Sequence, residues 1–512
     1  MENQDQYLKK LWWLLGISFC FKLFVGTVLE LGNDEVYYWT YALQPDYNHF
    51  DHPPMVGLLI RLTTFNLHWV SGLSLRLGAI IGCGISSIFI FKTGKQIANE
   101  RVGWYAALLY NVSIYTGFIA GLFILPDSPQ MPFWTAALYV MSLLITEQKE
   151  KQLSTWLGLG LLIGLACLCK VHGLYLWAGF GIYILFNQPK WLLNYRLYLG
   201  FVATLIFFLP IVYWNILNDF ITYKFHSERV TKFSTDWDNL LQELVGEFAY
   251  QHPIVFVISL LGIGFSIKHS KLLKSQVQSW LFWMSIPMIV FFWSMALFNS
   301  SLPHWSGPGY IPLYFMAGQY LSTKSNRLYP ISLRIAMGGV VMVVLAGYAF
   351  TRYLPLQLGS KDMSTLGETN PLLDISGWSD FGNEFNAFYL ADVSKGNMQK
   401  DAPIVVNNWF PGGHILFYVA RATGQPVIGI GKLNELHKFA WLNKMMPALA
   451  LQDNAYFIVP SNVPCNELDQ YLDYFTSIEK AAVIDQKVGG KLVRYFTIYR
   501  MKKCKRLPEK VF

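Results

Sequence analysis

Residues 30–41 of this chain read ELGNDEVYYWTY, and residues 50–54 read FDHPP. Both stretches follow the first long apolar run, which begins near residue 11. Carboxylates are costly beside lipid, and in a membrane protein they usually mark a functional site or a water-filled cavity. The two stretches therefore predict a first loop outside the membrane that takes part in chemistry at the membrane surface.

Long apolar segments dominate the chain up to about residue 350. The 512 residues are 53% hydrophobic and only 14% charged, and a segment of about 18 to 20 apolar residues can cross a hydrocarbon core of roughly 30 Å. We expect about eleven transmembrane helices, near residues 11–29, 73–91, 102–122, 130–146, 155–169, 173–187, 197–213, 254–268, 280–298, 308–322 and 332–350. The first segment is expected to be retained, because acidic and aromatic residues follow it instead of a small-residue cleavage site.

Basic residues gather in alternate loops between these segments. They are Lys9 and Lys10, Lys92, Lys95 and Arg101, Lys149 and Lys151, Lys190 and Arg196, Lys268, Lys271 and Lys274, and Lys324, Arg327 and Arg334. Cytoplasmic loops carry an excess of Lys and Arg, so this side and the N-terminus are expected in the cytoplasm. The same rule accounts for the net charge of +8 without a nucleic-acid partner.

The character of the chain changes after residue 351. Residues 352–512 contain short β-branched runs, turn residues and helix-like segments, which are typical of a small α/β domain. We expect residues 1–351 to form a transmembrane domain with a periplasmic loop at 30–72, and residues 352–512 to form a periplasmic domain. Of the six cysteines, only Cys465 and Cys504 are candidates for a disulfide, and the sequence does not decide whether they pair.

The loops on the side opposite the basic groups supply carboxylates, imidazoles and cations. They carry Asp34, Glu35, Asp51, His52, Asp127, Lys170, His172, His226, Glu228, Arg229, Glu247, His252 and His304. Lys and Arg can bind an anionic phosphate, and a carboxylate can take the proton of an attacking hydroxyl.

Structural explanations stay open for several of these residues. Asp127 or Ser128 can cap the helix that follows. The apolar stem of Lys170 can lie along the membrane interior while its charged end reaches the membrane surface. Tyr37 and Tyr38 can belong to an interfacial aromatic belt.

The ordered set of motifs resembles the membrane glycosyltransferases that use a polyprenyl-phosphate sugar donor. This group has the GT-C fold and includes the lipid A aminoarabinose transferases and the protein O-mannosyltransferases. The motifs are DEVYYW at 34–39, FDHPP at 50–54, PDSP at 126–129, the run 164–170 that ends in Lys170, PIVYWN at 210–215 with Asp219 and Phe220, and PHW at 303–305.

The resemblance implies a GT-C bundle of transmembrane helices with a periplasmic active site and an inverting transfer. Asp34 matches the acid of the family's first loop, which activates the acceptor, with Glu35 as its neighbour, and Asp127 matches the second acid. The soluble domain after the last span is nearer the lipid A-modifying branch than the O-mannosyltransferases.

The residues expected to bind substrates are Tyr37, Tyr38, Asp51, His52, Lys170, His172, Arg229 and His304. The resemblance favours Lys170 and Arg229 as partners of the donor phosphate, because His52 stands where the aminoarabinose transferases carry Lys. A divalent metal is an open possibility, with Asp51 and His226 as weak candidate ligands.

The predicted function is transfer of a sugar from an undecaprenyl-phosphate carrier to an acceptor at the outer face of a bacterial inner membrane. The acceptor is expected to be lipid A or another envelope glycan, and a protein acceptor is the alternative. A transporter of lipid-linked sugars is less favoured, because such proteins show matching halves with broken spans and here the polar residues gather in the first loop. The enzyme hypothesis expects the acids of that loop to meet Asp127 in one wet pocket.

Overall fold

The computed structural model describes residues 5–228, 235–269, 275–447, 449–465 and 467–508. The chain divides into two compact units, one made of residues 1–26 and 45–342 and the other of residues 27–44 and 343–512. The opening part of the expected periplasmic loop, including Asp34 and Glu35, therefore packs with the C-terminal residues.

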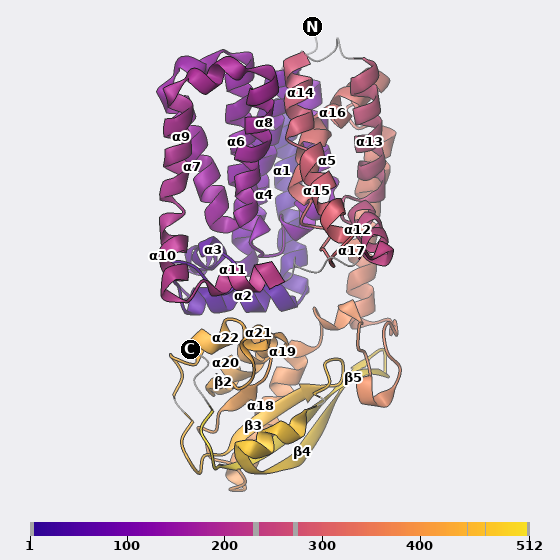
Figure 1. The fold of residues 1–512 in the computed structure, drawn as a ribbon. Coiled ribbons are helices and arrows are strands. Elements are labelled where there is room, and N and C mark those ends of the chain that lie inside the picture. Colours follow the sequence, from indigo (N-terminus) through magenta and orange to yellow (C-terminus); the bar gives the residue numbers. More distant parts are fainter. Residues whose placement is uncertain (1–4, 229–234, 270–274, 448, 466, 509–512) are drawn as a thin grey trace. The chain divides into compact units, whose positions relative to one another are not determined.

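The first unit is helical (Figure 1). Its longer elements are α1 (Asp5–Val28), α3 (Met55–Thr63), α4 (Gly72–Ile97), α5 (Glu100–Val112), α6 (Asp127–Thr146), α7 (Leu153–Cys169), α8 (Tyr175–Asn187), α9 (Tyr195–Ile206), α10 (Leu209–Leu217), α11 (Ile221–Glu228), α12 (Trp237–Tyr250), α13 (Pro253–Lys268), α14 (Ser275–Trp283), α15 (Ile286–Ala296), α16 (Gly307–Lys324) and the first part of α17 (Ile331–Arg352). Short turns of helix lie between them at Tyr115–Ile119, Lys149–Lys151, Val171–Leu174 and Pro189–Leu193.

All eleven predicted apolar segments lie on helices or on pairs of consecutive helices. Among the residues that the structure describes, five helical stretches are long and apolar enough to cross a membrane, namely Gln6–Val28, Gly72–Ile97, Tyr195–Leu217, Ser275–Ala296 and Ile331–Arg352. The pair α12 and α13 passes the same test together but is bent by 99°, and Leu153–Cys169 and Val171–Asn187 are shorter apolar helices. The chain is thus mostly helical with several potential spans, and the number eleven stays a prediction.

Glycines allow neighbouring helices of this unit to approach closely. A Cβ atom on Gly160 of α7 would lie 1.9 Å from the carbonyl oxygen of Gly200 in α9, and one on Gly94 of α4 would lie 2.5 Å from the Cα of Gly103 in α5. Small residues at helix contacts are the usual means by which membrane helices bring their backbones together. Both contacts belong to the framework that holds α6 and α7, the two helices that carry the site described below.

The second unit contains a five-stranded sheet with helices packed on it. The strands are β1 (Ile404–Val406), β2 (Val427–Gly429), β3 (Ala455–Pro460), β4 (Phe475–Val488) and β5 (Lys491–Cys504), in the order β2-β1-β3-β5-β4. The pairs β1–β2 and β1–β3 are parallel, while β3–β5 and β4–β5 are antiparallel. The expected small α/β domain is therefore present, and its core includes Val405, Ala455, Phe457 and Met501.

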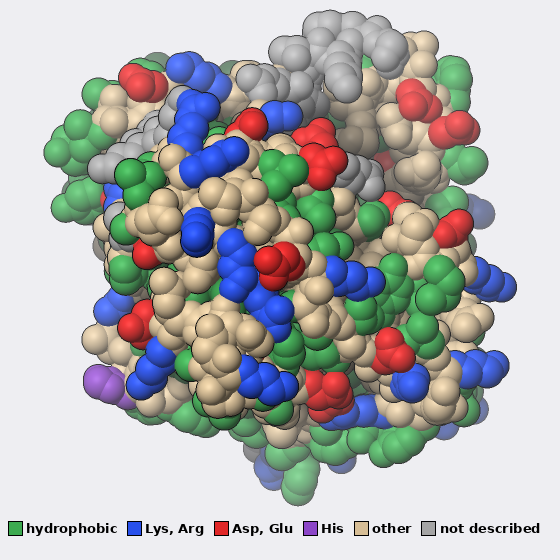
Figure 2. Space-filling model, turned by 90° about the horizontal axis from the view of Figure 1, so that it is seen from below, with side chains coloured by type: hydrophobic (Ala, Val, Ile, Leu, Met, Phe, Trp, Pro, Cys, Tyr) green, Lys and Arg blue, Asp and Glu red, His purple; other side chains and the backbone are tan. Residues whose placement is uncertain are grey.

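The helices of this unit are α2 (Asn33–Leu43), the last turns of α17, α18 (Trp378–Ser394), α19 (Trp409–His414), α20 (Arg421–Thr423), α21 (Leu433–Leu436) and α22 (Phe439–Leu442). Shorter helical turns lie at Met363–Thr365, Pro371–Leu373, Ile415–Ala420 and Leu468–Asp473. Cys465 and Cys504 are both free thiols. The face drawn in Figure 2 carries Lys and Arg side chains interspersed with Asp and Glu, a mixture that suits contact with water.

Candidate active site

The turn that precedes α6 fixes the position of Asp127. Ser128 Oγ accepts a hydrogen bond from Leu125 N at 3.0 Å and donates one to Phe123 O at 2.6 Å. The side chain of Ser128, rather than that of Asp127, thus forms hydrogen bonds with the backbone of this turn. The carboxylate of Asp127 is left to interact with side chains, although the residue is only 2% exposed.

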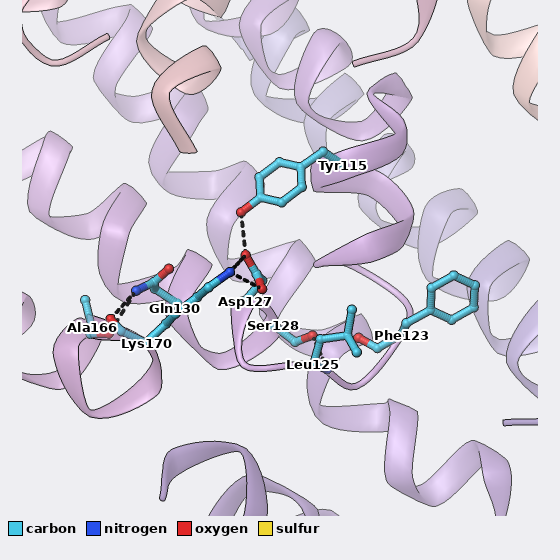
Figure 3. A network of polar contacts seen from close by, with 8 residues as sticks. All are labelled: Tyr115, Phe123, Leu125, Asp127, Ser128, Gln130, Ala166 and Lys170. Carbon is cyan, nitrogen blue, oxygen red and sulfur yellow. Dashed lines mark hydrogen bonds and ion pairs between the residues drawn. The ribbon is translucent and has the colours of Figure 1, made fainter. Parts of the chain in front are cut away.

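Asp127 forms a buried ion pair with Lys170 (Figure 3). Lys170 Nζ donates to Oδ1 at 3.1 Å and to Oδ2 at 3.0 Å, and the hydroxyl of Tyr115 donates to Oδ1 at 2.8 Å. The side chains of Lys170 and Asp127 are 5% and 3% exposed. Burying either charge alone would be expensive, so each makes the burial of the other tolerable.

Gln130 holds the backbone that carries Lys170. Its Nε2 donates to Lys170 O at 2.8 Å and to Ala166 O at 3.1 Å. Lys170 follows the last residue of α7 and has an extended conformation, with φ of −158° and ψ of 133°. Gln130 lies one helical turn after Asp127 on α6, so a single helix face provides both the counter-charge and the backbone support of the lysine.

Three histidines lie within electrostatic range of this ion pair. His52, His172 and His304 each interact electrostatically with both Lys170 and Asp127. They come from the segment before α3, the turn after α7 and the segment before α16. The structure therefore brings together five of the residues that the sequence singled out, from four separate parts of the chain.

The pKa values of the groups between the expected spans define the charge of this cluster. Burial, reinforced by the Lys170 cation, lowers the pKa of His52 to about 4 and that of His304 to about 4. Burial opposes ionisation of Asp127, but the positive charge of Lys170 and the hydrogen bonds from Lys170 and Tyr115 hold its pKa below the usual range. At neutral pH the cluster thus contains an ionised Asp127 carboxylate and neutral imidazoles.

Asp51 and His226 lie beside the same cluster. The ring of His226 hydrogen-bonds the backbone oxygen of Asp51 at 2.9 Å, and its centroid is 6.3 Å from that of His52. Within the described ranges, the structure has no group of three or more His, Cys, Asp or Glu side chains placed to hold a metal ion. Arg229 falls outside the residues that the structure describes.

Asp34 and Glu35 lie in the first turn of α2, in the second unit. Asp34 is exposed, whereas Glu35 is 2% exposed and its Oε2 accepts a hydrogen bond from Gly32 N at 2.9 Å. Glu35 therefore closes the N-terminus of the helix. Of the two carboxylates, Asp34 is the one that faces solvent.

Tyr37 and Tyr38 are buried on α2. The ring of Tyr37 packs against Trp409 at 5.2 Å and against His437 at 5.8 Å between centroids. Their packing within the second unit is a structural function, and a role in substrate binding stays a prediction.

Tyr115 and Gln130 are components of the cluster that sequence reasoning missed. Tyr115 lies in a short π-helical turn, Tyr115–Ile119, within an apolar stretch. Its only local signal is a phenol in an otherwise apolar run, which occurs equally in ordinary cores. Gln130 had a better signal, because a residue three positions after Asp127 shares its helix face.

Comparison with known protein families and sequences finds similarity to glycosyltransferases. Residues 51–214 match the family model described as dolichyl-phosphate-mannose-protein mannosyltransferase. The chain is 22% identical over 313 residues to lipid A galacturonosyltransferase RgtD of Rhizobium johnstonii. That alignment covers 59% of this chain and 62% of the relative, so it spans less than two thirds of the relative's length.

Solved structures with a similar fold include ArnT from Cupriavidus metallidurans. The alignment with its apo structure covers 96% of this chain and 98% of the ArnT chain, with a TM-score of 0.58 and 14% sequence identity. The alignment with its structure bound to undecaprenyl phosphate covers 97% of this chain and 98% of the ArnT chain, with a TM-score of 0.59 and 14% sequence identity. The resemblance to GT-C membrane glycosyltransferases that the motifs predicted is confirmed, and the chain has their fold.

Proposed function

We propose, from the premise of a GT-C glycosyltransferase fold, that this chain is an inverting transferase that uses a polyprenyl-phosphate sugar. The donor carrier is undecaprenyl phosphate, and the acceptor is lipid A or another envelope glycan. The reaction takes place at the periplasmic face of a bacterial inner membrane, with the N-terminus of the chain in the cytoplasm. The C-terminal α/β domain is also periplasmic in this proposal.

The buried Lys170–Asp127 pair is the observation that carries the proposal. An ammonium held at 3.0 Å from a carboxylate, and fixed through its own backbone by Gln130, is preorganised. It does not need to be ordered when a phosphate arrives, which is the main advantage of a prebuilt electrostatic site. The neutral His52, His172 and His304 add hydrogen-bonding groups around that charge without repelling the cation.

The site suits stabilisation of a leaving phosphate. In the proposed step an acceptor oxygen attacks the anomeric carbon on the face opposite the phosphate. The new glycosidic bond forms as the bond from the anomeric carbon to the phosphate oxygen breaks, and the electron pair leaves with the polyprenyl phosphate. Lys170 stabilises the negative charge that develops on that oxygen.

Asp34 is the proposed acceptor-activating group. It is an exposed carboxylate in the first turn of α2, and Glu35 occupies the capping position beside it. In the proposed reaction Asp34 takes the proton of the acceptor hydroxyl, while Asp127 stays ionised and keeps Lys170 in place. Asp51 is kept as a candidate for substrate contact and Arg229 as a candidate partner of the donor phosphate, while His226 is kept only as a weak candidate metal ligand together with Asp51.

Lipid A is favoured as acceptor because the relative found by sequence is named as a lipid A galacturonosyltransferase. The soluble domain after the last long helix agrees with the layout of ArnT, whose fold matches over almost the whole chain. A protein acceptor is the second candidate, since the matching family model is described as a protein mannosyltransferase.

Mass spectrometry of envelope lipids and glycoproteins tests the proposal. Cells lacking the gene are expected to lose one sugar from lipid A or another glycan, and the wild-type gene is expected to restore it. Asp34→Asn is expected to leave the sugar missing although the protein is inserted at normal levels. Identical glycan and glycoprotein profiles with and without the gene would refute the proposed function.

A further inference from the structure

The segment that leads into α2 is hydrogen-bonded to the C-terminal domain. Glu30 Oε2 accepts from Trp378 N at 2.8 Å and Oε1 accepts from Ser379 N at 3.1 Å. These two amides open α18, so the Glu30 carboxylate lies at the N-terminus of that helix and satisfies donors that the helix itself leaves unpaired. One residue later, Leu31 N donates to the hydroxyl of Tyr418 at 2.8 Å.

Asn33, the first residue of α2, is held by a side chain from the same domain. Its Oδ1 lies 2.9 Å from Nε2 of His414. His414 is fully buried, and its ring stacks on Trp378 at 4.2 Å with an interplanar angle of 6°. The guanidinium of Arg494 lies 4.3 Å from the centre of the Trp378 ring. The partner of Asn33 is therefore itself fixed in a stack of rigid groups.

Close backbone packing completes the contact. A Cβ on Gly413 would lie 2.9 Å from Cγ2 of Val36 and 3.3 Å from Tyr37 N, so the glycine permits α2 to lie directly on α19. The Trp39 ring packs edge-on against Phe417 at 5.0 Å. Residues 30–39 are thus held at both ends of the Asp34 turn, by hydrogen bonds before it and by ring packing after it.

We propose that the C-terminal α/β domain is a clamp that positions the acceptor-activating carboxylate, with Tyr418, Asn33 and His414 as positioning residues. This inference rests on the proposed function of Asp34. The clamp acts on the direction of that carboxylate and touches no substrate. It explains why the chain carries an α/β domain after its last long helix and why residues 27–44 fold with that domain.

Two mild variants test the clamp in the full-length protein. Tyr418→Phe removes the hydroxyl that accepts from Leu31 N. Asn33→Ala removes the amide oxygen that pairs with Nε2 of His414 from the α2 side, together with the hydrogen bond of Asn33 to the Asp374 carboxyl. Tyr495→Phe is the matched control, because it removes a tyrosine hydroxyl that donates to Met363 O at 2.7 Å, elsewhere in the same domain. The readouts are amide hydrogen exchange of peptides within residues 30–43 and steady-state transfer kinetics.

Each test variant is expected to speed exchange in residues 31–36 by roughly fivefold, which is the effect of losing one neutral hydrogen bond on local opening. Transfer is expected to slow through kcat, with the donor KM unchanged, while the control matches the wild type in both readouts. Wild-type exchange and wild-type kcat in both test variants would overturn the clamp. Failure of the wild-type protein to transfer any sugar would instead refute the proposed function, whereas the exchange data would still report on the anchoring of α2.

Discussion

Asp127 and Lys170 depend on each other for burial. Each would be an isolated buried charge without its partner, and breaking a buried pair commonly costs about 3–5 kcal/mol. Tyr115 holds the pair in place through a hydrogen bond to the Asp127 carboxylate, and Gln130 does so through a hydrogen bond to the backbone oxygen of Lys170. The pair is thus at once a structural element and the proposed phosphate site, and its two roles can be separated by experiment.

A double-mutant cycle measures the structural role of the pair. Asp127→Asn and Lys170→Met are each expected to lower the free energy of unfolding by about 3–5 kcal/mol, because each leaves one buried charge unpaired. The double variant is expected to lose clearly less than the sum, since it leaves neither charge. Unfolding of the detergent-solubilised proteins provides the measurement, and strictly additive losses would show that the two side chains do not interact.

The lowered pKa values of His52 and His304 predict a pH dependence of stability. Both groups have pKa values of about 4 in the folded protein, against about 6.5 when unfolded. Between these values the unfolded state binds more protons, so stability is full above about pH 6.5 and falls as the pH drops towards 4. Asp127 adds to this loss only below its unfolded pKa of about 3.8, because its folded pKa is lower still.

Thermal unfolding of the wild-type protein and of His52→Gln between pH 7 and pH 4 checks this prediction. The glutamine variant is expected to lose less stability over that interval than the wild type does. Equal pH dependence of the two proteins would contradict the assignment of His52 as a buried neutral imidazole.

The sequence predicted the charged and imidazole members of the cluster by their chemistry, but it missed Tyr115 and Gln130. Charged and imidazole side chains in loops between apolar segments were recognisable, and His52, Asp127, Lys170, His172 and His304 do lie together. The sequence could not assign Glu35 to helix capping or Tyr37 to ring packing, because both depend on neighbours brought by the fold. Which of the residues act on substrate stays a prediction.

The contact between α7 and α9 shows how helix packing supports the site. Gly160 and Gly200 let the two backbones touch, and α7 ends at the residue before Lys170. The periodicity of the sequence does not reveal this contact, because α7 is almost uniformly apolar. The same uniformity hides the breaks between α9 and α10 and between α14 and α15, which were predicted as continuous segments.

Gly160→Ala is expected to destabilise the helical unit, because its Cβ would lie 1.9 Å from Gly200 O and one helix must move. A cost of about 1–3 kcal/mol is typical of such overpacking. Gly158→Ala is the matched control on the same helix, since its Cβ would meet nothing within 4 Å. Unfolding measurements that find the two variants equally stable would contradict the close contact of α7 with α9.

The apolar segments and the small sheet were predictable from the sequence. The division of the chain into a unit of residues 1–26 and 45–342 and a unit of residues 27–44 and 343–512 was harder to predict. The length of an apolar segment indicates a helix and a short β-branched run indicates a strand, and each of these signals lies within one stretch of sequence. The folding of residues 27–44 with residues 343–512 is a long-range association that leaves no such signal. It follows from Glu30, Leu31 and Asn33 finding partners more than three hundred positions away.

A reporter fused after Phe512 tests the proposed topology. With the N-terminus in the cytoplasm and an odd number of spans, the reporter is expected on the periplasmic side. Fusions at Lys149 and Lys324 are expected to label the cytoplasm, because both residues belong to the basic loops. A cytoplasmic signal from the C-terminal fusion would mean that the number of spans is even.

Binding of undecaprenyl phosphate to the purified protein tests whether Lys170 and Asp127 form a phosphate site. The wild-type protein is expected to bind this carrier, and Lys170→Met is expected to raise the Kd at least about tenfold, since a charged hydrogen bond to phosphate contributes about 1.5–3 kcal/mol. Lys190→Met, at an exposed lysine in one of the basic loops, is expected to bind as the wild type does. Equal affinity of the wild type and Lys170→Met would contradict a phosphate site built on Lys170 and Asp127.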